Sequence, residues 1–291
     1  LKKYGADILR IWVAASNYAE DLRIDYSILD QHSESYRKIR NTFRYLLGNI
    51  NDKFEDIDLD EIDIESLPEL EKFMLNKIYS LNKRFDDCFQ RYDFHNLYKE
   101  LLNFCTVDLS AFYFDIRKDS LYCDPTDSEK RESCVVVLNI LLKSLLRWFA
   151  PILSFTTEEI YQMVSKKSKS VHLEKFLKFP EKFKNDNLEK KWSKLIKIRD
   201  MCNISIEEKR ASKEIGSSLE ADLEIRLNKK FEDIISNIDL TELCIVSKVN
   251  INFDDQSDIL VETKKASGNK CAVCWKIRRD PCERHPKCQI T

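Results

Sequence analysis

The apolar run at residues 134–149, C-V-V-V-L-N-I-L-L-K-S-L-L-R-W-F, decides the fold. Its apolar side chains lie on nearly every side of a helix, so other elements must cover most of the helix surface. The run is too short for a bilayer, and Asn139, Lys143 and Arg147 interrupt it, which argues against a membrane span. Pro151 removes a backbone donor and predicts where the helix ends. The run therefore predicts the central helix of a helical bundle.

Amphipathic segments on both sides of this run predict the helices that cover it. A polar connection is expected at 17–30, and Thr156 and Glu159 have the spacing of a capping box. Helices are expected at 4–15, 34–50, 68–89, 94–114 and 154–164. About six helices with short connections favour an antiparallel bundle.

After residue 166 the pattern changes to that of a small α+β unit. A helix is expected around 188–202, and apolar residues then alternate from Leu219 to Leu227, as in a half-buried strand. Partner strands are expected at 243–251 and 259–263, with a helix at 229–238 between them. The expected fold class is mainly α: a helical bundle, then a small α+β unit and a C-terminal zinc finger.

Charge is distributed unevenly along the 291 residues, whose net charge is only −2. A net charge this close to zero does not attract the whole chain to nucleic acid, so any such binding must use local patches of positive charge. Residues 51–72 carry ten acids against two lysines and are expected to form a solvated linker. Residues 264–291 carry eight basic residues against two acids, which makes the tail a candidate surface for an anionic partner.

Six of the ten cysteines are scattered singly, and four lie in the last 21 residues. Scattered cysteines and an opening unlike a signal or transit peptide indicate a cytoplasmic protein with reduced thiols. The opening also lacks an initiator Met, which suggests a fragment of a longer chain.

In the tail, Cys271 and Cys274 have the two-residue gap with which two thiolates reach one tetrahedral Zn²⁺. Cys282, His285 and Cys288 supply more donors than the two remaining positions need. The tail has too few apolar residues for a core, whereas a structural zinc would fold it. Free thiols in a disordered tail are the alternative, and disulfides and a catalytic zinc are disfavoured.

Trp275 follows the second cysteine directly and lies among Lys276, Arg278 and Arg279. An aromatic ring beside basic residues can stack on an unpaired base. Covering the zinc knuckle is the other role open to it.

Several motifs together resemble class I aminoacyl-tRNA synthetases. They lie at 4–24 (Y-G-A-D-I-L-R-I-W-V-A-A-S-N-Y-A-E-D-L-R-I), 35–49 (S-Y-R-K-I-R-N-T-F-R-Y-L-L-G-N), 110–122 (S-A-F-Y-F-D-I-R-K-D-S-L-Y), 150–160 (A-P-I-L-S-F-T-T-E-E-I) and 215–221 (I-G-S-S-L-E-A). With the terminal C-x-x-C-W, they resemble the bacterial isoleucyl-tRNA synthetase family more than the valyl and leucyl families.

The resemblance implies a C-terminal part of such a synthetase that recognises tRNA(Ile) and acts as a monomer without membrane contact. It divides the chain into a stem-contact junction (1–30), an anticodon-binding bundle (31–184), an α+β subdomain (185–263) and a zinc-finger tail (264–291). Isoleucine transfer, ATP binding and editing would belong to domains outside these residues. The K-K-S-K-S of 166–170 resembles the ATP-binding loop of the family, but it follows the bundle, so surface lysines are the better interpretation.

The tail departs from the family ending H-P-x-L-C-x-R-C, because Cys288 is followed only by Q-I-T. The expected zinc ligands are Cys271, Cys274, Cys282 and Cys288, and whether Cys282, His285 or a residue further downstream completes the set is left open.

Arg37, Arg40 and Arg44 form a basic stripe and are candidate tRNA contacts with Trp275. Solvated arginines paired with nearby acids are the alternative. A free-standing RNA-binding or scaffold protein is the second possible function. A complete enzyme is disfavoured, because no paired nucleophile and base or phosphate-binding glycine loop is found.

Overall fold

The computed structural model of the chain describes residues 3–50, 54, 57–165, 170–255, 258–282 and 285. The chain divides into two compact units. Unit 1 comprises Leu1–Arg117 and Pro125–Asn185, and unit 2 comprises Lys118–Asp124 and Asp186–Thr291. Among the described residues, no helix is both long and apolar enough to cross a membrane.

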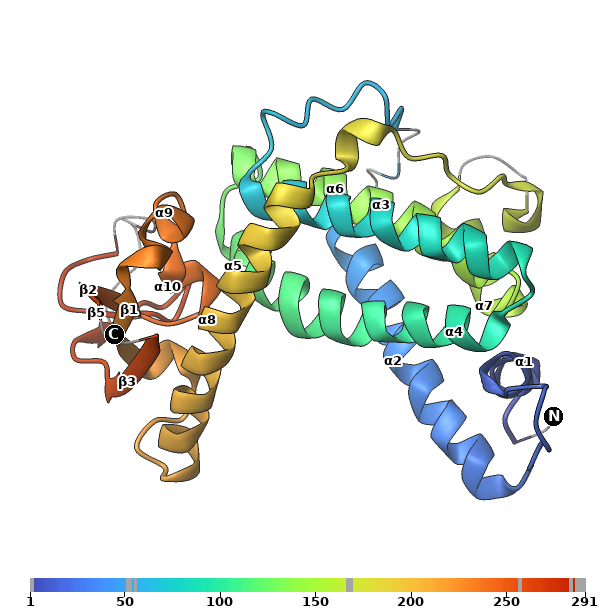
Figure 1. Cartoon of the computed structure of the whole chain (residues 1–291), viewed down its shortest axis with the longest axis horizontal. Helices are drawn as coiled ribbons and strands as arrows, with labels where there is room; N and C mark the ends of the chain where they lie inside the picture. Colours follow the sequence, from blue (N-terminus) through green and yellow to red (C-terminus); the bar gives the residue numbers. More distant parts are fainter. Residues whose placement is uncertain are drawn as a thin grey trace. The chain divides into compact units, whose positions relative to one another are not determined.

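Unit 1 is helical, as expected (Figure 1). One long helical stretch combines α4, a π-helical segment and α5, and the last residues of α5 belong to unit 2. The elements are α1 (Ala6–Ala15), α2 (Tyr26–Ile50), α3 (Glu69–Gln90), α4 (Phe94–Asn103), the π-helical segment (Phe104–Tyr113), α5 (Phe114–Cys123), α6 (Glu129–Phe149) and α7 (Ser154–Val164).

The helix α6 contains the apolar run and forms the centre of unit 1. Every residue from 137 to 146 is buried, so all sides of the helix are covered. Helices α2, α3 and α7 pack against it. Phe43 of α2 meets Phe149 edge-on at 6.1 Å between ring centroids, and the Trp148 Nε1 donates to Asn82 Oδ1 at 3.1 Å. The prediction of a central helix is confirmed.

Carboxylates cap the starts of two helices in ways that the predictions did not include. Helix α2 begins at Tyr26 rather than residue 34, since the Asp25 carboxylate accepts hydrogen bonds from Ile28 N and Ser27 Oγ. The predicted capping box is wrong: Thr156 lies within the first turn of α7, where its backbone N and its hydroxyl both donate to Asp7 of α1. One helix therefore caps another.

The acidic segment contains a buried ion pair, which the expectation of a solvated linker missed. Glu71 in α3 is fully buried, and the Arg117 guanidinium donates to its two oxygens at 2.7 and 2.6 Å. Tyr113 OH donates to the same carboxylate at 3.1 Å. These three side chains join α3 to the π-helical segment and α5 inside unit 1.

Unit 2 is built on α8 (Asp186–Ala211) and a three-stranded sheet. Strand β1 (Ala221–Asn228) lies in the middle, parallel to β2 (Lys248–Asp254) and antiparallel to β3 (Ile259–Lys265). Side chains of β1 alternate between buried and partly exposed, as predicted. The first expected partner strand starts later than predicted, at Lys248, because Leu243 is the last residue of α10 (Leu240–Leu243); α9 (Glu232–Ile235) precedes α10. A hairpin of β4 (Asn269–Lys270) and β5 (Ile277–Arg278) follows.

Candidate functional site

A cluster of three cysteines and one histidine lies next to the β4–β5 hairpin. The ligand atoms of Cys271, Cys274, Cys282 and His285 all lie within 4.8 Å of one another, and the three cysteines are buried. Sγ of Cys274 is 3.9 Å from Sγ of Cys282. Nδ1 of His285 is 3.8 Å from Sγ of Cys271 and 3.5 Å from Sγ of Cys282. We call these four residues the Cys3His cluster.

The backbone of the hairpin turn holds the first two sulfurs together. Cys271 N donates to Lys276 O at 2.9 Å, and Trp275 N donates to Cys271 O at 3.0 Å. Trp275 adopts the left-handed conformation, with φ of 62°, which tightens the turn. The two-residue gap therefore gives a knuckle with both thiols on one side.

The last residue of α5 orients the histidine. His285 Nε2 lies 3.1 Å from Cys123 O, which can only accept, so Nε2 carries the hydrogen and Nδ1 presents its lone pair to the cluster. Cys123 Sγ in turn donates to Val273 O in the knuckle at 3.6 Å. A hydrogen bond of this kind fixes the tautomer of metal-ligating histidines. Nothing in the pattern around Cys123 predicted that it belongs here rather than in the core.

The geometry of the Cys3His cluster fits a tetrahedral metal. A metal about 2.3 Å from each sulfur and about 2.0–2.1 Å from nitrogen separates two sulfurs by about 3.8 Å and sulfur from nitrogen by about 3.6 Å. The three separations given above, 3.9 Å between sulfurs and 3.8 and 3.5 Å between sulfur and nitrogen, are close to these values. Without a metal, burial raises the pKa of the Cys274 thiol to about 12, and the neighbouring sulfurs add to the shift. The cluster can therefore bind a metal, and its four donors leave no position open.

The Cys3His cluster contains three of the predicted site residues, namely Cys271, Cys274 and Cys282. The fourth position is taken by His285, which the sequence offered as one of several donors. The predicted ligand Cys288 lies outside the described residues and stays a prediction.

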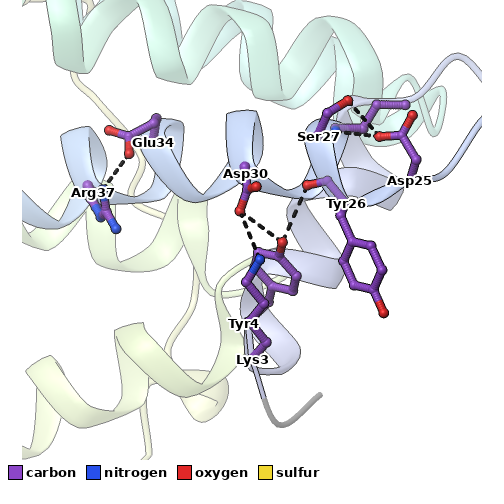
Figure 2. Close-up of polar contacts among 9 residues, drawn as sticks. Lys3, Tyr4, Asp25, Tyr26, Ser27, Asp30, Glu34 and Arg37 are labelled. Carbon is purple, nitrogen blue, oxygen red and sulfur yellow. Dashed lines mark hydrogen bonds and ion pairs between the residues drawn. The ribbon is translucent and has the colours of Figure 1, made fainter.

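The three predicted arginines all lie exposed on α2, but their surroundings differ. Arg37 pairs with Glu34 one turn earlier (Figure 2). Within the described ranges, Arg40 and Arg44 have neither an ion-pair nor a hydrogen-bond partner. Their positive charges are thus available to a ligand, whereas that of Arg37 is partly engaged.

The N-terminal segment is fastened to the start of the same helix. Figure 2 shows Lys3 and Tyr4 turned toward Asp30. Tyr4 OH donates to Asp30 Oδ1 at 2.8 Å, and Lys3 Nζ lies 3.6 Å from the same oxygen. The rings of Tyr4 and Tyr26 stack with their centroids 6.4 Å apart. The site residues on α2 therefore stand on a helix that is anchored at its first turn.

The side chain of Trp275 is largely exposed, which leaves open both roles considered for it. Its side chain is 59% exposed, and Lys270 Nζ lies over the ring at 5.3 Å from the centroid. A ring with an open face and an adjacent cation can stack on an unpaired base. The lysines of the K-K-S-K-S loop, residues 166–169, lie outside the described residues.

The family described as the anticodon-binding domain of tRNA ligase matches residues 71–225. The chain belongs to this family. It is 66% identical over 285 residues to the isoleucine–tRNA ligase of Pelagibacter ubique, covering 98% of this chain and 32% of the relative. It is 40% identical over 292 residues to the isoleucine–tRNA ligase of Agrobacterium fabrum, a match that covers 96% of this chain and 30% of that ligase. The isoleucine–tRNA ligase of Petrotoga mobilis is 37% identical to it over 287 residues, a match that covers 95% of this chain and 31% of that ligase.

These comparisons confirm the resemblance seen in the sequence. The chain spans about a third of the length of these isoleucine–tRNA ligases and corresponds to a C-terminal part of them. The anticodon-binding match begins in α3 and ends in β1. It includes the buried Glu71–Arg117 pair, which the structure shows to be part of the core of the domain. The α2 arginines and the Cys3His cluster lie outside the matched residues, so their roles are proposals.

Proposed function

We propose that this chain is the tRNA(Ile)-recognition part of an isoleucine–tRNA ligase, which attaches isoleucine to its tRNA using ATP. The observation that carries the proposal is the 66% identity to such a ligase over 98% of the chain, together with the anticodon-binding match. Anticodon bases are unpaired, so a protein can stack on them and read their edges while Lys and Arg hold the phosphates. Catalysis is assigned to segments of the longer proteins that this chain does not match.

The sequence-predicted division supplies the roles of the segments. Residues 1–30 form the stem-contact junction and 31–184 the anticodon-binding bundle, while 185–263 and 264–291 form the α+β subdomain and the zinc finger. The zinc is structural and is held by Cys271, Cys274 and Cys282 with His285, or with Cys288 in place of one of them. The separations within the Cys3His cluster support this ligand set.

Four side chains are proposed to contact the tRNA. Arg37, Arg40 and Arg44 face solvent on one helix and hold backbone phosphates, and Trp275 stacks on a base. The protein is proposed to act as a monomer in the cytoplasm. The nine cysteines of the described part are all free of disulfides, which suits a reducing compartment.

Binding of an isolated tRNA(Ile) anticodon stem-loop tests the proposal. The 291-residue chain should bind it, bind a stem-loop with an altered anticodon more weakly, and bind both more weakly as salt rises. The chain should show no isoleucine-dependent exchange of pyrophosphate with ATP. Equal binding of both stem-loops would favour a general RNA-binding or scaffold protein, and measurable exchange would overturn the assignment of catalysis elsewhere.

The role of Trp275 is tested by Trp275→Ala. Losing one base stack costs about 1–3 kcal/mol, so stem-loop affinity should fall by about tenfold to a hundredfold. Tyr92→Ala is the control, because Tyr92 is also a largely exposed aromatic, at 70%. The zinc content must stay unchanged in both variants. Unchanged affinity of a zinc-loaded Trp275→Ala protein would contradict the stacking role.

A further inference from the structure

Unit 2 contains a cavity of about 540 Å³ between the sheet and the β4–β5 hairpin. Asp222 of β1 and Lys248 of β2 line it from the sheet, Asp239 lines it from the start of α10, and Lys276 and Arg278 line it from the hairpin. Its volume lies within the range of small-molecule sites, about 300–1,000 Å³. We call it the hairpin cavity.

Three polar groups of the hairpin cavity lack partners inside the protein. The Lys276 side chain is only 8% exposed, and no ion pair or hydrogen bond of its ammonium is found among the described residues. Asp222 Oδ1 and Arg278 Nε are buried without a hydrogen-bond partner. Buried polar groups are nearly always hydrogen-bonded, and a charged one left unpaired is costly. Two buried unpaired atoms and one ammonium without a partner around a single cavity favour a polar ligand there.

The walls that carry these groups are held in place by other contacts. Ile277 N donates to Ser247 Oγ at 2.6 Å, and this hydroxyl donates to Leu219 O, which ties the hairpin to the sheet. The backbone of Lys276 is part of the knuckle turn. Asp239 is already engaged, since it accepts from Thr241 N and Glu242 N. Asp222, Lys276 and Arg278 are therefore the groups free to bind.

The charges of the hairpin cavity identify the class of ligand. Four cations line it, Lys248, Lys276, Arg278 and Arg279, against three carboxylates, Asp222, Asp239 and Asp280. Because cations outnumber carboxylates, the cavity suits an anionic phosphodiester. The Asp222 carboxyl, which lines the same cavity, suits a group with N–H donors. Burial raises the pKa of Asp222, although the positive charges of Lys248 and Arg279 act to lower it. A nucleotide carries both a phosphate and a base edge with N–H groups.

We propose that the hairpin cavity binds one unpaired nucleotide of the bound RNA, with its phosphate on Lys276 and Arg278 and its base edge against Asp222. This inference rests on the proposed tRNA recognition and assigns to it a site in unit 2, whereas the α2 arginines belong to unit 1.

Stem-loop binding by Lys276→Met and Asp222→Asn variants of the full chain tests the cavity. Methionine keeps the buried stem and removes the charge, so affinity should fall by about tenfold to a hundredfold, as for one lost charge-assisted hydrogen bond. Lys230→Met is the control, because Lys230 lies outside the cavity and pairs with Asp258 on the surface of unit 2. It should change affinity by less than about threefold. If Lys276→Met loses its metal, Lys248→Met in β2 replaces it.

Titration with free nucleotides separates this site from the proposed function. Each nucleoside 5′-monophosphate should bind the wild-type chain more tightly than inorganic phosphate does, and Lys276→Met should abolish the difference. Wild-type stem-loop affinity in zinc-loaded Lys276→Met and Asp222→Asn proteins would overturn the cavity assignment and leave tRNA recognition standing. Failure of the wild-type chain to bind any stem-loop would instead overturn the proposed function.

Discussion

The centre of unit 1 and the Cys3His cluster of unit 2 show two ways of holding a chain together. In α6, ten consecutive residues from 137 to 146 are buried, so apolar surface removed from water stabilises the helices around it. In the cluster, the buried side chains are Cys271, Cys274 and Cys282, and among the described residues Cys123 is the one partly buried hydrophobic residue packed against them. So little apolar surface cannot fix a fold unaided. Unit 1 should therefore be stable without a ligand, whereas the knuckle should depend on its metal.

Removing the metal gives the largest expected effect. Structural zinc in small fingers contributes roughly 10–16 kcal/mol of apparent binding free energy, which is then folding free energy. Chelation or Cys271→Ser should unfold the knuckle, while far-UV circular dichroism of the helices changes little. Acidification should also release the metal, because protons compete for the thiolates.

Metal analysis and the fluorescence of Trp275 check this outcome. Cys88→Ser is the control, since Cys88 is a buried cysteine of unit 1 and should leave the zinc in place. Near-stoichiometric zinc and an unchanged knuckle in Cys271→Ser would contradict the proposed site.

Breaking the buried ion pair of unit 1 gives the next largest effect. Glu71→Ala removes the carboxylate that pairs with the buried Arg117 guanidinium, which should cost about 3–5 kcal/mol of unfolding free energy. The matched control is Glu65→Ala, because Glu65 belongs to the same acidic segment but its side chain is 92% exposed beside Lys72. That change should cost less than about 1 kcal/mol.

Denaturant unfolding of the two variants, followed by helical signal, measures the difference. Zinc content should be the same in both, since neither residue lies in unit 2. Equal stabilities of the Glu71 and Glu65 variants would show that the buried pair adds nothing to the core.

The sequence predicted features that depend on neighbouring residues and missed those that depend on distant ones. The apolar run of α6, the bounds of α7 and the alternation of β1 follow from periodicity. The first turn of α7 is capped by the Asp7 carboxylate, about 150 residues away along the chain, and no local sequence pattern predicts this contact.

The candidate site shows the same limit. The C-x-x-C spacing predicted Cys271 and Cys274 because a tight turn places both thiols together. The presence of His285 in the cluster could not be predicted, because it depends on a hydrogen bond to Cys123 in another segment. The Asp25 cap of α2, by contrast, was visible in the sequence, since Asp is a preferred N-cap residue.

One substitution, Gly to Ala, should act in opposite directions in the two units. Gly268 has φ of 137°, and an added Cβ would lie 2.2 Å from Arg278 O of the paired strand β5. Gly268→Ala should therefore destabilise the hairpin by about 1–3 kcal/mol. Gly48 lies within α2, and nothing lies within 4 Å of its added Cβ, so Gly48→Ala should stabilise unit 1 by about 0.5–1 kcal/mol.

Hydrogen exchange of the hairpin amides and thermal unfolding of unit 1 measure the two effects. Loss of hairpin protection in Gly268→Ala alone is the expected result. A tolerated Gly268→Ala would mean that the hairpin can open without cost, and the walls of the hairpin cavity would then not be rigid.

The smallest expected effects separate the three arginines of α2. Arg40→Gln and Arg44→Gln should each weaken stem-loop binding a few-fold and reduce the slope of log K against log salt by about 0.7–0.9, the value for one phosphate contact. Arg37→Gln should change the slope less, because its guanidinium is already paired with Glu34. In a Glu34→Gln background, which removes the partner of Arg37, all three arginine substitutions should reduce the salt slope by the same amount. Protein stability should stay unchanged throughout, since exposed charges contribute little to it. If Arg37→Gln, Arg40→Gln and Arg44→Gln all reduced the slope of log K against log salt equally, the Arg37–Glu34 ion pair would open at no cost when RNA binds. The three arginines would then contribute equally to phosphate binding.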